Sequence, residues 1–216
     1  MSDRPSAPPR KHRSRNYHHG NLRSALLEAA FEELGATGMR ELSLRNLAGR
    51  VGVSHAAPYR HFRNKRALLS ALGEEGHRSL RDAITGALAM AAPSAQSRAH
   101  AAALAYVRFA LESRCRYALL LGEETGAMRE AADATRDLLG RVVAVEARSP
   151  EAQRAIGTLA WALLHGLTEL CFARQVDASD QEALERLLGL ASGQLVELSK
   201  RDGLDELGGL LGERRL

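Results

Sequence analysis

Side chains suited to contacting a nucleic acid are concentrated between positions 54 and 65 of this 216-residue chain. Arg60 can pair with a guanine edge or with a phosphate, and Tyr59 and His61 can donate hydrogen bonds to phosphate oxygens. The alanines at positions 56 and 57 allow close approach to a groove wall and contact with thymine methyl groups. Lys65 adds an ammonium group at the start of a further predicted helix, where backbone N–H groups also favour phosphate. This segment is therefore a candidate DNA-binding surface.

The residues just before this surface predict a helix followed by a tight turn. Apolar side chains at helical spacing predict a helix over 44–51, with Ser43 as its N-cap, and Gly52 supplies the positive φ angle that ends it. The small side chain of Ala48 lets two helices approach, and Val53 fills the angle between them. The pattern is that of a helix-turn-helix.

A third helix is predicted over about 55–62, with Ser54 as its cap. Pro58 stands at the end of the first turn of this helix, where at most one backbone hydrogen bond is lost. The helix would turn its outer face, including Tyr59 and His61, toward DNA. The alternative is an ordinary helical hairpin in which these two side chains are packing residues.

The remainder of the chain repeats the helical spacing of Leu and Ala. Aromatic residues make up only 4% of the sequence, and no strand pattern of useful length occurs. The other predicted helices cover about 21–36, 65–88, 96–112, 115–121, 124–146, 150–174 and 180–200. The sequence therefore predicts an all-α fold of about nine helices.

Charge divides the chain into two parts. Residues 1–66 carry 13 Lys and Arg against 5 Asp and Glu, whereas the other 150 residues carry 17 against 21, so a net +8 and a net −4 sum to the overall +4. This split predicts a polyanion-binding N-terminal part. The predicted organisation is a flexible basic arm over 1–18, a helix-turn-helix domain over 19–66, an effector-binding and dimerisation domain over 67–202, and a tail over 203–216.

From Tyr17 to about residue 75 the chain resembles the DNA-binding domain of TetR-type transcriptional regulators. The resemblance rests on Tyr17-His18-His19-Gly20-Asn21-Leu22, Ser43-Leu44, Gly52-Val53-Ser54 and, most specifically, Tyr59-Arg60-His61-Phe62-Arg63-Asn64-Lys65-Arg66-Ala67-Leu68-Leu69. The family's contacts to DNA fall on Ser43, Ser54, His55, Ala56, Ala57, Tyr59, Arg60, His61 and Lys65. Pro58 and the paired alanines depart from the more polar recognition helices common in the family, so the resemblance does not specify which bases are contacted.

The family resemblance implies a dimeric regulator, typically a repressor, that binds a palindromic operator and is released by a small-molecule effector. Its C-terminal domain would enclose the ligand cavity, and a fourth helix would carry the motion to the DNA-binding helices. A second, shorter resemblance supports this: Trp161-Ala162-Leu163-Leu164-His165-Gly166 is similar to the Trp/His-Gly element of the WHG subgroup of TetR regulators.

Polar residues on otherwise apolar helices are the candidates for effector binding. Trp161, His165 and Glu169 recur every four residues and lie along one strip of the predicted helix 150–174. This strip is either part of an effector cavity or a hydrogen-bonded His–Glu pair beside a packed Trp at a dimer face. Further candidates, each of which can also be an ordinary helix-face residue, are Tyr106, Arg108, Glu112 and Tyr117.

Two apolar stripes predict how two chains meet. The helix 180–200 carries Leu184, Leu187, Leu188, Ala191, Leu195 and Leu198, and the helix 150–174 carries Ile156, Leu159, Leu163, Leu167 and Leu170. Two such faces suffice for a four-helix interface across a two-fold axis, which predicts a homodimer through the last two long helices. The alternative is that both stripes pack within one subunit.

Two other classes of protein fit the sequence less well. An enzyme using His165 and Glu169 as an acid–base pair would lack a nucleophile motif, a Gly-rich phosphate loop and a metal set, so no catalytic residue or cofactor is predicted. A helical adaptor that binds acidic proteins would not explain the turn at Gly52 followed by Tyr59-Arg60-His61-Phe62.

Metal binding and membrane insertion are not predicted either. The adjacent His18 and His19 have no third ligand at metal spacing, and Cys115 and Cys171 stand in no metal or redox spacing. The basic N-terminal segment lacks the apolar core of a signal peptide, and no apolar run approaches the roughly 18–20 residues that cross a bilayer. A cytoplasmic protein with reduced cysteines is expected.

Overall fold

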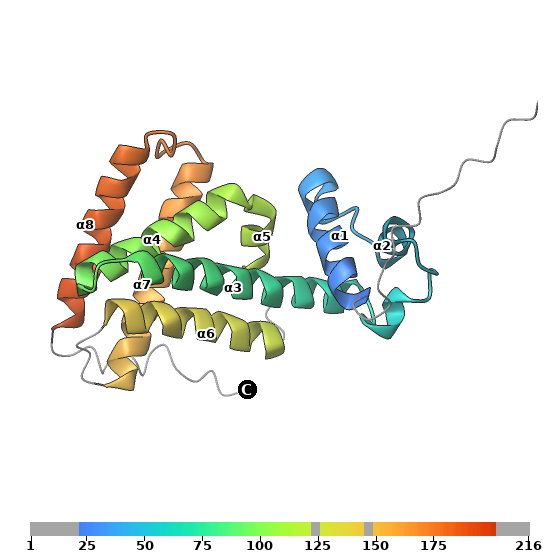
Figure 1. Cartoon of the computed structure of the whole chain (residues 1–216), viewed down its shortest axis with the longest axis horizontal. Coiled ribbons are helices and arrows are strands. Elements are labelled where there is room, and N and C mark those ends of the chain that lie inside the picture. Colours follow the sequence, from blue (N-terminus) through green and yellow to red (C-terminus); the bar gives the residue numbers. More distant parts are fainter. Residues whose placement is uncertain (1–21, 122–125, 145–148, 202–216) are drawn as a thin grey trace, which may run out of the picture.

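The computed structural model describes residues 22–121, 126–144 and 149–201 (Figure 1). Within these ranges it contains eight α-helices, one 3-10 helix and no strand, which confirms the all-α fold. In chain order they are α1 (Leu22–Thr37), α2 (Leu44–Val51), the 3-10 helix Pro58–Arg60, α3 (Lys65–Met90), α4 (Ala95–Glu112), α5 (Arg114–Leu119), α6 (Gly126–Val143), α7 (Pro150–Phe172) and α8 (Gln181–Ser199). The expected basic arm 1–18, with His18 and His19, and the expected tail 203–216 lie outside the described residues.

The first three helical elements form an N-terminal unit around a small apolar core. Leu26 of α1, Leu47 of α2 and Phe62 after the 3-10 helix are each at most 2% exposed and belong to one cluster of buried residues. Leu68 of α3 and Leu119 of α5 join the same cluster. Burying these side chains together stabilises the unit and also joins it to the rest of the chain.

α3 connects the N-terminal unit to the C-terminal bundle. Its first turn is capped by Asn64, whose side-chain oxygen accepts a hydrogen bond from the backbone N–H of Ala67 at 2.9 Å. From there it runs for 26 residues, and Figure 1 shows it extending from beside α1 into the bundle formed with α4, α6, α7 and α8. A movement of α3 is therefore shared by both parts of the molecule.

The bundle includes a tight crossing of α6 and α7 at two glycines. A Cβ atom added to Gly157 of α7 would collide with the backbone carbonyl oxygen of Arg136 on α6. A Cβ atom added to Gly140 of α6 would lie 2.5 Å from the carbonyl oxygen of Gln153 on α7. Both positions therefore need a residue without a side chain, because backbone atoms cannot move aside as side chains do.

The prediction of a third α-helix over about 55–62 is wrong. Over 55–62 the chain forms turns and the 3-10 helix Pro58–Arg60 in place of two α-helical turns. Proline has no backbone N–H, so it cannot donate the bond to the carbonyl of Ser54 that an α-helix would require. The chain uses shorter-range bonds instead, including Ala57 N–H to the Ser54 carbonyl oxygen at 2.9 Å.

A second difference concerns α7, because the sequence analysis expected no apolar run long enough to cross a membrane. Its 23 residues include an 18-residue window with a mean hydropathy of 1.4, enough in length and composition to cross a bilayer. Counting uninterrupted apolar residues misses this window because isolated polar residues interrupt it. In the structure 44% of the window is buried, where α7 packs against α6, α4 and α8.

Candidate nucleic-acid interface and effector region

The turn after α2 is held by backbone hydrogen bonds. Gly52 has φ +76°, and its N–H and that of Val53 donate to carbonyl oxygens of Gly49 and Ala48 at 3.3 and 2.9 Å. At the other end of α2 the Ser43 hydroxyl oxygen accepts from the backbone N–H of Asn46 at 3.1 Å. The cap at Ser43 and the turn at Gly52 are thus as the sequence predicts.

The side chains after this turn face solvent on a short segment. Ser54, His55, Ala56, Tyr59, Arg60 and His61 are exposed, Ala57 is half-buried, and Pro58 and Phe62 are buried. Tyr59 is 55% exposed, so the alternative that it packs inside a plain hairpin is wrong. Phe62 closes the segment onto the core, and its N–H and that of His61 both donate to the Pro58 carbonyl oxygen at 2.9 and 3.0 Å.

Two predicted DNA contacts lie at the edge of this surface. Ser43 is half-buried and its oxygen is engaged as a helix cap. Lys65 is half-buried too, and its ammonium donates to the Arg40 carbonyl oxygen at 3.0 Å. This bond ties the start of α3 to the loop before α2, and it leaves two further N–H groups of the ammonium for other acceptors.

Four of the seven predicted effector residues meet in one aromatic cluster. The ring of Tyr106 makes edge contacts with Tyr117 and Trp161, at centroid distances of 6.2 and 5.6 Å. Tyr117 stacks on His165 at 5.5 Å, and its hydroxyl hydrogen-bonds Nδ1 of His165. Sequence analysis missed two members of the aromatic cluster: His77, stacked on Trp161 at 5.7 Å, and Phe172, which contacts Tyr117 at 5.5 Å.

The two tyrosines of the aromatic cluster, Tyr106 and Tyr117, are shielded from water. Tyr106 is fully buried, and burial raises the pKa of its hydroxyl far above the usual value. That hydroxyl interacts with Tyr117 electrostatically but makes no hydrogen bond of normal geometry. Burial, followed by the charge of Glu169, raises the pKa of Tyr117 to about 12. Both phenols are therefore neutral at physiological pH.

The His77 ring contacts Thr135 of α6 inside the bundle. Nδ1 of His77 lies 3.2 Å from the Thr135 hydroxyl oxygen, which also lies 2.9 Å from the Ala131 carbonyl oxygen and accepts a hydrogen bond from Arg81 at 3.2 Å. The buried Nε2 of His77 has no hydrogen-bond partner among the described residues.

The charged form of His77 is strongly disfavoured. Burial, then the positive charges of Arg81 and Arg136, lower the pKa of His77 to about 4, against a smaller opposing effect of the Leu120 backbone. His77 lies on α3 and Thr135 on α6, so this neutral pair also joins the connecting helix to the bundle.

The other three predicted effector residues do not belong inside this cluster. Arg108 forms an ion pair with Glu185 of α8 at 3.0 Å, with half of its side chain exposed. Glu112 is exposed at the end of α4, and Glu169 is exposed on α7. The hydrogen bond of His165 goes to Tyr117, so the alternative of a His165–Glu169 pair beside the tryptophan is not what forms.

Comparison with known proteins matches an N-terminal and a C-terminal part of the chain to one family. The description "Bacterial regulatory proteins, tetR family" matches residues 26–72, from α1 into α3. The description "Tetracyclin repressor-like, C-terminal domain" matches residues 99–190, from α4 into α8. Neither description names the WHG subgroup, which remains a prediction.

Two proteins of similar sequence are tetracycline repressors. The class C tetracycline repressor protein of Escherichia coli is 52% identical over 52 residues, and the class A protein from transposon 1721, also from Escherichia coli, is 49% identical over 51 residues. Each match spans 24% of either chain, so the chain matches about a quarter of the length of these relatives.

Solved structures extend the likeness over most of the chain. A protein of unknown function from Rhodococcus sp. RHA1 is 36% identical, with 85% of this chain and 97% of that one covered and a TM-score of 0.70. The fold also matches a TetR variant from Acinetobacter baumannii AYE in complex with minocycline, at 24% identity, 81% and 93% coverage and a TM-score of 0.57. The chain belongs to the TetR family of bacterial transcriptional regulators, with an N-terminal helix-turn-helix DNA-binding domain and a tetracycline-repressor-like C-terminal domain.

Proposed function

We propose that this chain is a homodimeric, cytoplasmic repressor that binds a palindromic operator and leaves it when a small molecule binds the C-terminal domain. The observation that carries the proposal is the exposed segment from Ser54 to His61, which follows the hydrogen-bonded turn at Gly52. This segment lies in the part of the chain matched by the TetR-family description, and similar regulators of known name are tetracycline repressors.

The DNA contacts are proposed for the residues predicted from the sequence. Tyr59, Arg60 and His61 present donors on one exposed face, and half-buried Ala57 with exposed Ala56 lets the chain approach a groove wall. Since the segment is a 3-10 turn and not a two-turn helix, few side chains can reach bases. Most of the affinity would then come from phosphate contacts, including those of the basic arm 1–18, and would fall as salt rises.

Dimerisation is proposed through α7 and α8. Leu159, Leu163 and Leu170 of the predicted stripe on α7 are 38–41% exposed, and Leu187 of the predicted stripe on α8 is 40% exposed. Leu190 on α8, which the sequence did not place in the stripe, is 70% exposed. Other members of the predicted stripes, such as Ile156 and Leu188, are fully buried within the subunit. The exposed members are what a partner would cover across a two-fold axis. Two recognition segments about 34–36 Å apart, or a multiple of this, would then meet the two half-sites.

The effector site is proposed at the aromatic cluster and the strip of α7 that carries it. Tyr106, Tyr117, Trp161 and His165 would contact the ligand, and exposed Glu169 would lie at the edge. Because His77 of α3 stacks on Trp161, a ligand that displaces the tryptophan would act on the helix that leads to the DNA-binding unit. This is a population shift between DNA-binding and released forms.

DNA selection tests the proposal. We expect the full-length protein to retain a palindromic fragment from a genomic or random pool, with a molar mass in solution twice that of one chain. Tyr59→Ala should weaken binding to the selected DNA by about 1–3 kcal/mol, since it removes an exposed phosphate contact and little packing. If the unsubstituted protein and the Tyr59→Ala variant both retained unrelated DNA as well as the selected fragment, operator recognition would be contradicted. A single chain bound to the selected fragment would contradict the dimer.

Effector binding has a built-in reporter, because Trp161 is the only tryptophan in the chain. A ligand in the aromatic cluster should change its fluorescence at the same concentrations that release the DNA. A compound that releases the DNA with no change in Trp161 emission would place the effector site elsewhere.

A further inference from the structure

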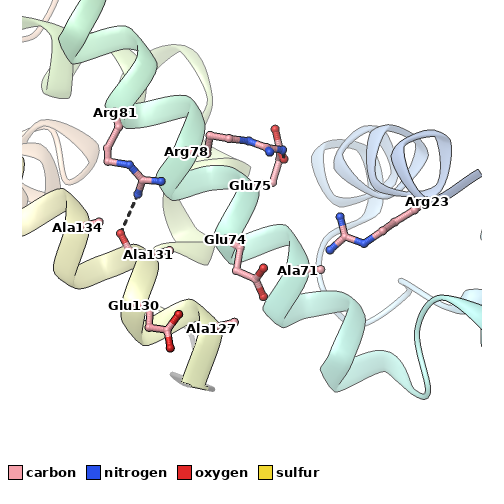
Figure 2. Close-up of a pocket in the computed structure, with 10 residues that line it drawn as sticks. All are labelled: Arg23, Ala71, Glu74, Glu75, Arg78, Arg81, Ala127, Glu130, Ala131 and Ala134. Atoms are coloured by element: carbon pink, nitrogen blue, oxygen red, sulfur yellow. Dashed lines mark hydrogen bonds and ion pairs between the residues drawn. The ribbon is translucent and has the colours of Figure 1, made fainter. Parts of the chain in front are cut away.

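A surface pocket of about 380 Å³ lies where α1 of the N-terminal unit meets α3 and α6 (Figure 2). Alanines from α3 and α6 line it together with six charged side chains. A second pocket of about 350 Å³ lies between α1, α3 and α5 and shares three lining residues with the first: Arg23, Glu75 and Arg78. By contrast, the apolar cavity between α4, α6, α7 and α8 measures about 10 Å³, room for about one water molecule.

The part of this pair of pockets between α3 and α6 is acidic. Figure 2 shows the carboxylates of Glu74 on α3 and Glu130 on α6 directed into the space between the two helices. Glu74 accepts a long hydrogen bond, 3.4 Å, from Ser70, and Glu130 is exposed with no ion-pair partner among the described residues. Arg81, at the far end, is anchored by a 2.8 Å bond to the Ala131 carbonyl oxygen. Two carboxylates without ion-pair partners attract a cationic group.

The part between α1 and α5 has a small positive charge, because Arg23, Arg78 and Arg116 line it together with the carboxylates of Glu28 and Glu75. The guanidinium of Arg23 lies over the Phe62 ring at 5.6 Å, and that of Arg116 lies over the Phe31 ring at 4.5 Å. Neither arginine has a salt bridge within the described ranges. Contact through the flat face of a guanidinium leaves its N–H edge for a carboxylate or phosphate. Arg78 and Glu75 form an ion pair with each other, so they add little net charge where the two pockets meet.

We propose that the two pockets together bind an elongated zwitterion: an amino acid or short peptide with a free ammonium group and a free carboxylate. The ammonium would lie between Glu74 and Glu130, and the carboxylate at the N–H edges of Arg23 and Arg116. A simple anion would leave the two carboxylates unpaired, and a simple cation would leave the two arginines unpaired, so neither complements the whole site. The site goes beyond operator recognition and beyond the interior effector site.

The probe is trialanine, titrated into the full-length protein by isothermal calorimetry without DNA. We expect saturable binding of one peptide per chain, with a dissociation constant of about 1 mM or tighter. Acetylating the N-terminus or amidating the C-terminus should each weaken binding by about 10-fold, because each removes one charge–charge contact. Phosphate and putrescine, which carry one sign of charge each, should not displace the peptide.

Two substitutions test which residues bind the ammonium end and the carboxylate end of the peptide. Glu130→Gln and Arg23→Gln, both at exposed positions, should each weaken trialanine binding by about 5- to 10-fold. Glu130→Gln should leave the melting temperature unchanged, whereas Arg23→Gln should lower it slightly because it also removes the guanidinium contact with the Phe62 ring. Glu182→Gln on α8, exposed and distant from the pockets, is the matched control and should bind as the unsubstituted protein does. No saturable heat with trialanine, equal affinity for a blocked peptide, or unchanged binding by both variants would overturn the proposal. None of these outcomes depends on whether the protein binds an operator.

Discussion

The DNA-facing segment and the aromatic cluster carry their functional side chains in opposite ways. In the segment 54–61 the side chains are mostly exposed, and the backbone hydrogen bonds around Gly52 and Pro58 fix their positions. In the aromatic cluster the side chains themselves fill the space between α3, α4, α5 and α7, so Tyr106 and Tyr117 are nearly inaccessible to water. The candidate DNA-binding side chains therefore contribute little to the packing of the fold, whereas the candidate effector-binding side chains are part of the core.

This contrast predicts how each region responds to mutation. Removing an exposed side chain changes binding and leaves the free energy of unfolding nearly unchanged. Removing a buried one changes both, because burial and packing contribute to stability. Substitutions in the bundle should therefore show first as lower stability, and substitutions in the segment 54–61 as lower affinity for DNA.

The largest effect is expected for Gly157→Ala in the bundle. The new methyl group would meet the Arg136 carbonyl, a backbone atom that cannot rotate away, so α6 and α7 must separate. We expect the free energy of unfolding to fall by about 3 kcal/mol or more, measured by urea denaturation. Gly166→Ala on the same helix is the control: a Cβ atom there has nothing within 4 Å, and better helix propensity should stabilise by up to about 1 kcal/mol. Equal losses in both variants would show that the crossing is not tightly packed.

Acidification should weaken the bundle through His77. Its pKa is about 4 in the folded chain and near 6.5 when unfolded, so between these values the unfolded state binds more protons. Stability from the neutral ring is complete above pH 6.5 and is lost as the pH falls toward 4, by up to roughly 3 kcal/mol. His77→Gln, which does not titrate, should flatten the slope of unfolding free energy across this window. His55→Gln, in the exposed segment, should leave the slope intact, and a slope shared by all three proteins would contradict the assignment to His77.

On the DNA side, Arg60→Ala tests the separation of affinity from stability. We expect operator affinity to fall by about 1–3 kcal/mol in a gel-shift titration, with an unchanged melting temperature, because Arg60 is exposed. Arg186→Ala on α8 removes another exposed arginine, far from the segment, and should leave the affinity unchanged. If both variants lose the same affinity, net charge and not position would be the cause.

The sequence predicted the segment 54–61 better than it predicted the aromatic cluster, and the reason is the range of the contacts. The capping of α2 by Ser43 and its end at Gly52 depend on residues within a few positions, so local rules suffice. The same rules overestimated the third helix, since they counted the bond lost at Pro58 but not the shift of the whole segment to 3-10 geometry. The helical pattern of the bundle was also local, and the all-α fold followed from it.

The aromatic cluster depends on helix packing that the sequence does not encode locally. A period of four residues grouped Trp161, His165 and Glu169, but on a helix such a strip turns gradually and Glu169 ends up exposed. His77 gave no signal because it is one of many polar and charged residues on α3, and its partner Thr135 is 58 positions away. Arg108 was a candidate for the same pocket, yet it pairs with Glu185 of α8 instead.

The smallest effects come from a pair of hydroxyls inside the aromatic cluster. Tyr117→Phe removes the hydrogen bond to His165 and should lower the free energy of unfolding by about 1 kcal/mol. Tyr106→Phe removes a buried hydroxyl that makes no hydrogen bond of normal geometry, so it should change stability by less than about 0.5 kcal/mol or raise it. The two tyrosines are equally buried, so the difference between the variants measures the hydrogen bond apart from the packing. A larger loss for Tyr106→Phe would mean that its hydroxyl has a partner in solution, and a bound water or ligand in the aromatic cluster would then supply it.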